Sequence, residues 1–156
     1  ELGVPVIAAG GFCDGASLIA ALALGAEGVL MGTRFMATAE SPMHDNFKQW
    51  MVEAQETDTM VVERSIRNAA RIMKNDAAMT VARMEKEGAT LEDLLPVIAG
   101  RVGREAYLSG DINLGAIACG QAVGRVHEIK SVAELMDEII GDAREIVRRL
   151  EQVVSS

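Results

Sequence analysis

The pattern of hydrophobic and polar positions changes character once along this chain. Residues 4–9 (VPVIAA) are almost wholly apolar, and residues 28–31 (GVLM) form a second short apolar run. Continuous apolarity without alternation predicts strands that are buried on both faces, as in parallel sheets. Between the two runs, Asp14 is placed to cap a helix over about residues 15–24, which ends at a glycine. Residues 4–31 therefore predict one strand–helix–strand unit.

Helical patterns dominate the rest of the chain. Ser41-Pro42 predicts the start of a helix that runs to about residue 55. Residues 67–87 are rich in Ala, Met and Arg and permit another helix, which Gly88 ends. We therefore expect the segment after the second strand to be mainly helical.

Two capping boxes mark further helices. Thr90 and Asp93 form a near capping box for a short helix to about residue 99, and Ser131 and Glu134 form one for the last helix. The apolar positions of the last helix follow helical spacing at Leu135, Ile139, Ala143, Ile146 and Leu150. This helix is expected to pack through a single apolar stripe.

Glycine and alanine are dense over residues 114–126. Small residues let a helix lie close to another backbone or to a flat ligand. The pattern leaves both interpretations open.

These elements predict an α/β fold: the last two strands of a (β/α)8 (TIM) barrel plus a mainly helical added domain. Parallel strands need neighbours on both sides, and a whole barrel takes about 250 residues. This chain has 156 residues and begins at Glu1, already close to a strand. We therefore expect six earlier strands in a part of the polypeptide outside this sequence. The predicted parts are a barrel end (1–40), a helical substrate or lid domain (41–126) and a C-terminal helix packing back on the barrel (127–156).

Composition narrows the classes of partner. Lys and Arg total 15 and Asp and Glu total 23, so the formal charge is −8. An acidic chain with few aromatic residues is a poor nucleic-acid binder, and no apolar run approaches the roughly 18 residues of a membrane span. We expect neither a nucleic-acid nor a membrane partner. An anionic ligand would have to be held by local backbone dipoles.

Cys13 and Cys119 are the only cysteines, and neither belongs to a cluster with metal-ligand spacing. We expect two buried free thiols, no metal site and a cytoplasmic location. The sequence leaves the oligomeric state open, a homo-oligomer included.

Two glycine pairs follow the predicted strands. Gly10-Gly11 ends the first strand and Gly32-Thr33 ends the second. Glycine permits close approach of backbone N–H groups to a phosphate, and the loops after the last two barrel strands are a frequent phosphate site. The two pairs together predict phosphate binding, with the Thr33 hydroxyl as a further donor. Two tight turns without a ligand are the alternative.

The run PVIAAGGFCDGASLIAALALGAEGVLMGTRFMATAESPMH closely resembles the nitronate monooxygenase (2-nitropropane dioxygenase) family. Flavin-dependent enoyl-acyl-carrier-protein reductases are similar in this region. The likeness continues through RSIRNAARIMKN and GDINLGAIACGQAVG to SVAELMDEIIGDA, so it spans nearly the whole chain.

The resemblance implies an FMN-binding barrel with a helical domain over its mouth. It implies cofactor binding by Ala9, Gly10, Gly11, Leu30, Met31, Gly32 and Thr33, with Gly11 at the phosphate. A segment that approaches the flavin or substrate would contain Ala118, Cys119, Gly120 and Gln121. Some relatives carry Ser where this chain has Ala118. A hydrogen bond from that Ser to the substrate is therefore not expected in this protein.

The family's catalytic His is expected on an earlier barrel strand, outside this sequence. His44 and His127 match no catalytic position, and we interpret them as capping or surface residues. Arg34, Asp14 and Glu40 lie near the loops, and structural pairing is the expected role for all three.

The activity implied is FMN-dependent oxidation of small alkyl nitronates with O2 to a carbonyl compound and nitrite. An NAD(P)H:quinone reductase and an enoyl-thioester reductase on the same scaffold remain alternatives. An alternative of another class is a non-catalytic phosphate-ligand module or a subunit completed by a partner chain.

Overall fold

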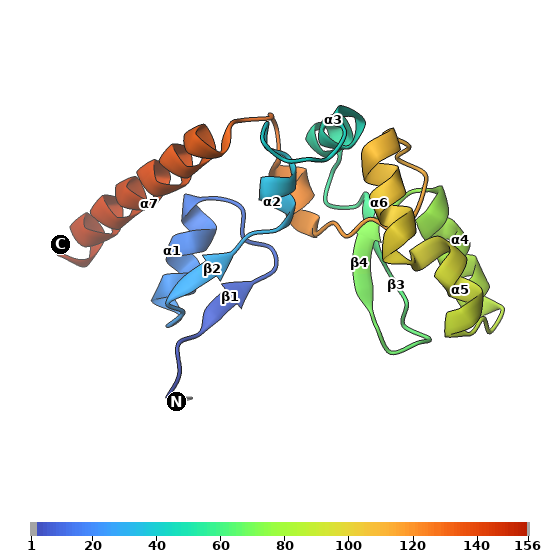
Figure 1. Ribbon diagram of the computed structural model, residues 1–156. Helices are drawn as coiled ribbons and strands as arrows, with labels where there is room; N and C mark the ends of the chain where they lie inside the picture. Colours follow the sequence, from blue (N-terminus) through green and yellow to red (C-terminus); the bar gives the residue numbers. More distant parts are fainter. Residues whose placement is uncertain (1–2, 156) are drawn as a thin grey trace.

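The computed structural model describes residues 3–155 and opens with the predicted strand–helix–strand unit (Figure 1). β1 (Ile7–Ala9), α1 (Gly15–Ala23) and β2 (Gly28–Leu30) follow in order, and β1 pairs with β2 in parallel. In this register Ala9 lies opposite Leu30, so both strands end at the same edge. The parallel pair and its crossover helix confirm the predicted order of elements.

The two strands are less buried than the apolar pattern predicted. Ile7 is 56% exposed and Leu30 is 60% exposed. A two-stranded sheet cannot cover both of its own faces, so burial of these residues by strands outside this sequence stays a prediction. The strands are also shorter than the apolar runs that predicted them.

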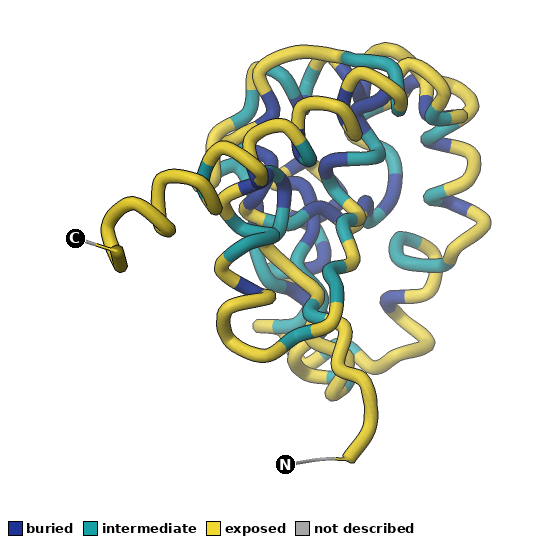
Figure 2. The backbone as a smooth tube through the Cα atoms, turned by 90° about the vertical axis from the view of Figure 1, so that its left-hand side faces the viewer, coloured by how far each residue is buried: buried dark blue, intermediate teal, exposed yellow. Residues whose placement is uncertain are grey.

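The long helix α7 (Val132–Val154) packs along α1, as Figure 1 shows. Ser131 and Glu134 form the predicted capping box at its start. The predicted stripe is buried at Leu135, Ile139 and Ala143, whereas Leu150 is 44% exposed. The apolar stripe is thus buried along the first half of α7, and Figure 2 shows the C-terminal turns of this helix exposed.

After β2 the chain makes the single-turn helix α2 (Thr33–Met36) and then α3 (Asp45–Glu53). The predicted start of α3 at Ser41-Pro42 is wrong. His44 is the N-cap residue, and its Nδ1 accepts a hydrogen bond from the Asn46 N–H at 3.2 Å. A ring nitrogen of histidine performs the capping that the Ser-Pro pair was expected to perform.

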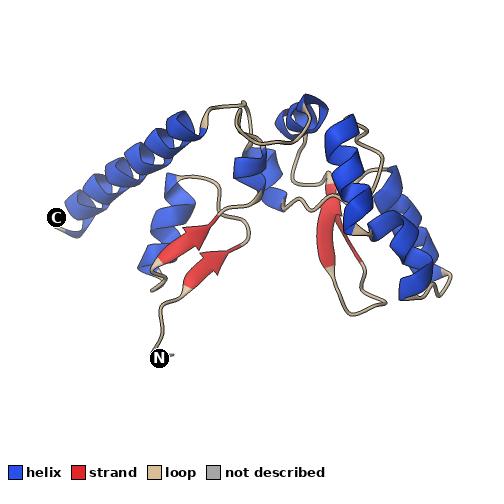
Figure 3. Ribbon diagram, viewed as in Figure 1, coloured by secondary structure: helices blue, strands red, loops and turns tan. Residues whose placement is uncertain are grey.

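A β-hairpin lies where a helix was expected (Figure 3). β3 (Thr59–Val62) and β4 (Ala70–Met73) pair antiparallel. The helix expected over residues 67–87 is therefore wrong in its first part, and only α4 (Asp76–Lys86) is helical there. Two further helices complete this region: α5 (Leu91–Ile98), with the predicted Thr90–Asp93 capping box, and α6 (Gly100–Ser109).

The small-residue segment over residues 114–126 forms no α-helix: a bend at 114–115 and the irregular residues 116–120, with a bridge at Ala118, precede a short 3-10 helix. Ala118 forms an antiparallel bridge with Ile72 of β4, and the Met73 N–H donates to the Ile117 carbonyl at 2.8 Å. Only η1 (Gln121–Arg125), a 3-10 helix, follows before α7. The segment acts as a third strand beside the hairpin.

The helical part has two hydrophobic clusters. The first lies among α2, α3 and α6 and contains Ala37, Met43, Phe47, Met51, Met73, Ala106, Ile117, Cys119, Val123 and Val126. The second lies between the hairpin, α4 and α5 and contains Val62, Ile72, Ala78, Val81 and Leu94. No helix among residues 3–155 is long and apolar enough to cross a membrane.

The crossing of α1 and α7 leaves no room for a side chain at Gly15. A Cβ atom there would lie 2.5 Å from the Ala143 nitrogen and 2.6 Å from the Asp142 Cβ. We predict that Gly15→Ala lowers the free energy of unfolding by about 1–3 kcal/mol, as overpacked sites do. Denaturant titration of both proteins measures this difference.

Gly141→Ala is the matched control because it lies in α7 and a Cβ there meets nothing within 4 Å. It should stabilise the protein by up to about 1 kcal/mol through helix propensity alone. Equal effects of the two substitutions would contradict close packing at Gly15.

Candidate functional site

The two glycine loops leave adjacent strands at the same edge of the sheet. Gly10 follows Ala9 at the end of β1, and Met31 follows Leu30 at the end of β2, while Ala9 and Leu30 are partners in the register. All seven predicted cofactor-binding residues therefore lie at or beyond the carboxyl ends of two paired strands. In α/β folds ligands bind at this edge.

The backbone of these loops is exposed and unpaired. Within residues 3–155, the N–H groups of Gly10, Gly11 and Gly32 have no hydrogen-bond partner. Gly10 and Gly11 have φ values of 89° and 85°, a region that residues with a side chain rarely adopt. A Cβ at Gly32 would meet nothing within 4 Å. The loops thus combine free donors with open space.

Thr33 joins the second loop to the segment over residues 118–121. Its Oγ1 accepts a hydrogen bond from the Gly120 N–H at 2.9 Å. The same hydroxyl interacts with the Cys119 side chain. The structure thus brings the predicted cofactor loop and the predicted substrate segment together through one side chain.

The four residues of that segment face different surroundings. Ala118 and Gln121 are exposed and Gly120 is half-buried, whereas Cys119 is only 2% exposed and belongs to the core of the helical part. The Cys119 N–H donates to the Arg71 carbonyl at 3.1 Å. The accessible surface of the segment is therefore formed by Ala118, Gln121 and the backbone of Gly120.

Burial sets the chemistry of the two thiols. It raises the pKa of Cys119 to about 12, although the interaction with the Thr33 hydroxyl acts in the opposite direction. Burial, reinforced by the neighbouring Asp14 carboxylate, also raises the pKa of Cys13. Both thiols are free and protonated at neutral pH, so neither is an activated nucleophile.

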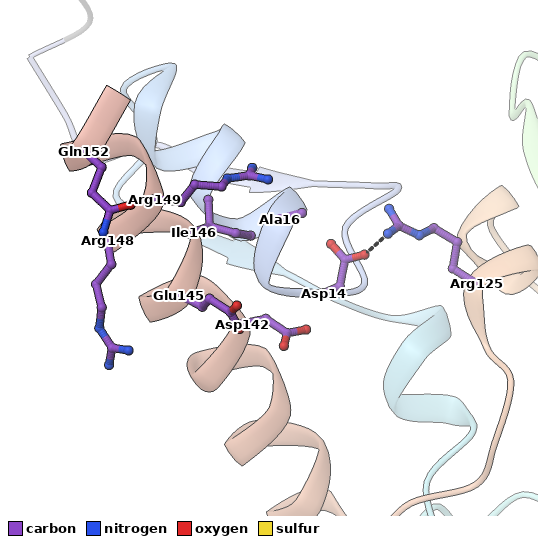
Figure 4. Close-up of a pocket in the computed structure, with 9 residues that line it drawn as sticks. All are labelled: Asp14, Ala16, Arg125, Asp142, Glu145, Ile146, Arg148, Arg149 and Gln152. Carbon is purple, nitrogen blue, oxygen red and sulfur yellow. Dashed lines mark ion pairs between the residues drawn. The ribbon is translucent and has the colours of Figure 1, made fainter. Parts of the chain in front are cut away.

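Two of the three charged residues near the loops have the expected structural partners. Asp14 caps α1 and forms an ion pair with Arg125, which Figure 4 shows. Burial opposes ionisation of Asp14, but hydrogen bonds from Ser17 and the charge of Arg125 outweigh it and lower its pKa. The Glu40 carboxylate accepts the Val132 N–H at 2.9 Å, at the start of α7.

Arg34 departs from the expected pairing. Its side chain is 5% exposed, and its Nη1 atom has no hydrogen-bond partner within residues 3–155. Among residues 3–155, Arg34 Nη1 therefore lacks the structural partner that was expected. The local sequence, GTRF, carries no signal that would distinguish a paired arginine from an unpaired one, because burial here depends on η1 and α7, far along the chain.

The strand–helix–strand unit, its two glycine loops and the helical domain after them define a class: a part of an α/β barrel with an added helical domain. The family profile described as nitronate monooxygenase matches residues 1–142. The chain therefore belongs to the nitronate monooxygenase family.

Individual relatives agree with this assignment. A probable nitronate monooxygenase from Staphylococcus saprophyticus is 30% identical over 96% of this chain and 41% of its own length. A (3aS,4S,5R,7aS)-5-hydroxy-7a-methyl-1-oxo-octahydro-1H-indene-4-carboxyl-CoA dehydrogenase from Mycobacterium tuberculosis is 30% identical over 90% of this chain and 50% of its own. The chain spans about half the length of the curated relatives that it matches.

Solved structures have the same fold. FabK from Thermotoga maritima superposes with a TM-score of 0.89 at 36% identity, over 97% of this chain and 48% of its own. A nitroalkane oxidase from Streptomyces ansochromogenes superposes with a TM-score of 0.73 at 24% identity, over 96% of this chain and 42% of its own. The chain thus corresponds to a part of the TIM-barrel fold with its added helices.

The buried thiols should resist alkylation. We predict that iodoacetamide at pH 8 modifies neither Cys13 nor Cys119 in the native protein, because both are buried and have raised pKa values. In denaturant both should react, and intact mass measurement distinguishes the two states. Rapid modification of either residue in the native protein would show that its thiol is accessible and ionised.

Proposed function

We propose that the two glycine loops bind the phosphate of FMN and that the complete protein oxidises alkyl nitronates with O2 to a carbonyl compound and nitrite. One observation carries the cofactor proposal: unpaired N–H groups of Gly10, Gly11 and Gly32 lie at the ends of two paired strands. Converging backbone N–H groups bind phosphate well. Membership of the nitronate monooxygenase family supports the reaction.

The residues present fit this group. Gly10 and Gly11 have positive φ values that favour glycine, and the open space at Gly10, Gly11 and Gly32 allows a phosphate oxygen to approach closely. The chain has a formal charge of −8, so these local dipoles, rather than the overall field, would attract the anion. Thr33 Oγ1 accepts the Gly120 N–H, which holds this hydroxyl beside the second glycine loop.

FMN would supply the redox chemistry of the reaction. In this proposal Ala9, Leu30 and Met31 form the floor beneath the cofactor, because they border the glycine loops. Ala118, Gly120 and Gln121 would form a wall beside the substrate, held in place through Thr33. We propose that the remaining barrel strands supply the catalytic base and that the enzyme acts in the cytoplasm, which its free thiols support.

Enoyl-thioester reduction with NAD(P)H is a second candidate. The similarity to FabK from Thermotoga maritima, with a TM-score of 0.89 at 36% identity, favours it. The glycine loops serve either reaction, since both candidates need the same cofactor phosphate. The substrate assay below separates them.

Gly32→Val tests the phosphate site. A Cβ at Gly32 meets no protein atom, so the variant should fold normally, while its side chain would occupy the place of the phosphate. We predict at least about tenfold weaker FMN binding, equivalent to about 1.4 kcal/mol. Fluorescence titration of the full-length apoprotein with FMN measures it.

Gly100→Val is the control, because a Cβ there also meets nothing within 4 Å. It should bind FMN as the wild type does. Full FMN affinity in Gly32→Val would refute the phosphate assignment. Gly11→Val is less informative because the φ of 85° strains any side chain there.

The reaction is tested on the full-length holoenzyme. We predict nitrite release from an alkyl nitronate with consumption of O2 and without NAD(P)H. Oxidation of NADH that depends on an enoyl thioester, without nitrite release from a nitronate, would replace the main proposal by the second candidate. NADH oxidation that depends on a quinone would contradict both candidates and identify a quinone reductase.

A further inference from the structure

Arg34 is the most unusual charged residue of the structure. It lies in α2, directly after the second glycine loop, and it is only 5% exposed. Its Nη1 atom has no hydrogen-bond partner within residues 3–155. A buried guanidinium without a partner is strongly disfavoured, because it loses its hydration and gains no compensating charge. Within residues 3–155 the Nη1 hydrogens of Arg34 therefore lack an acceptor, which a bound group could supply.

The Arg34 side chain lines a cavity between α2, the end of η1 and the first turns of α7. The cavity has a volume of about 230 Å³. Cys13 also lines it, and the positive charge of Arg34 is close enough to lower the pKa of that thiol, against the larger effects of burial and Asp14. The space is sufficient for a small ion and accompanying water.

The other cations around the cavity are already neutralised. Arg125 pairs with Asp14, and Lys130 pairs with Glu128 and Glu138. Figure 4 shows the first of these pairs, with Asp142 on the neighbouring face of α7. Asp142 has no ion pair within the described residues and is the one further carboxylate that lines the cavity. Arg34 is therefore the cation left to bind a ligand.

We propose that this cavity binds a small planar monovalent oxyanion, such as nitrite or a short carboxylate, with the Arg34 guanidinium as its main ligand. The planar fork of a guanidinium matches two oxygens of such an anion in a bidentate arrangement. The unpaired Asp142 carboxylate disfavours a dianion such as sulfate in the same space. None of the seven residues of the proposed phosphate loops lines this cavity, so the proposal does not depend on their assignment.

Binding is tested on the full-length protein with sodium nitrite and sodium acetate. Each is titrated calorimetrically at constant ionic strength, with gluconate as the bulky background anion. We expect saturable binding of at least one of the two to the wild type and about tenfold or greater weakening in Arg34→Met, as expected for charge-assisted hydrogen bonds. Separate titrations with nitrite and acetate show whether the cavity binds nitrite or a short carboxylate. Sulfate should bind more weakly than either anion.

Arg101→Met is the matched control, because Arg101 is exposed on α6 and does not line the cavity. It should bind both anions like the wild type. Absence of saturable binding to the wild type, or equal loss in both variants, would overturn the proposal.

A second variant keeps the proposal testable if Arg34→Met does not fold. Asp142→Asn removes the unpaired carboxylate at the exposed rim and should tighten anion binding several-fold. Unchanged or weaker binding in Asp142→Asn would contradict the site. The site would also be contradicted by a crystal structure of the full-length protein in which a carboxylate from another segment pairs with Arg34 Nη1.

Discussion

The parallel pairing of β1 with β2 is the constraint on which the candidate site depends. Each strand has three residues, so the register that places Ala9 opposite Leu30 alone decides where both loops begin. A shift of one residue would move one glycine loop away from the other and turn its side chains to the opposite face. The packing of α1 on α7, with Gly15 at the crossing, holds the crossover helix and therefore this register.

Thr33 links the strand pair to the helical part through a hydrogen bond. Its hydroxyl accepts the Gly120 N–H, and the backbone just before Gly120 pairs with β4 through Ala118 and Ile72. A displacement of the second loop would thus be transmitted to the segment expected to border the substrate. Such a continuous path of hydrogen bonds lets one short loop position both the cofactor side and the substrate side of a pocket.

Local signals sufficed for the strand–helix–strand unit and for the two predicted capping boxes, because those signals act within a few residues. The hairpin of β3 and β4 had no such signal. Its connection uses positive φ at Glu63 (62°) and Arg67 (59°), where no glycine marks the turn, and Glu85 of α4 accepts the Glu63 N–H. The pairing of β4 with Ala118 is also non-local, and strand formation depends strongly on such neighbours. The unpaired state of Arg34 depends in the same way on η1 and α7.

The density of small residues over residues 114–126 has a structural explanation at specific positions. A Cβ at Gly115 would lie 3.2 Å from the Gly103 nitrogen, and one at Gly124 would lie 2.7 Å from the Glu56 nitrogen. Close approach of backbones therefore accounts for these two glycines, without a ligand. Gly120 differs, because its nearest neighbour is the Thr33 hydroxyl at 3.3 Å, at the junction with the glycine loops. Of the two interpretations that the sequence left open, backbone packing applies to the ends of the segment, and contact with a ligand stays a prediction for its middle.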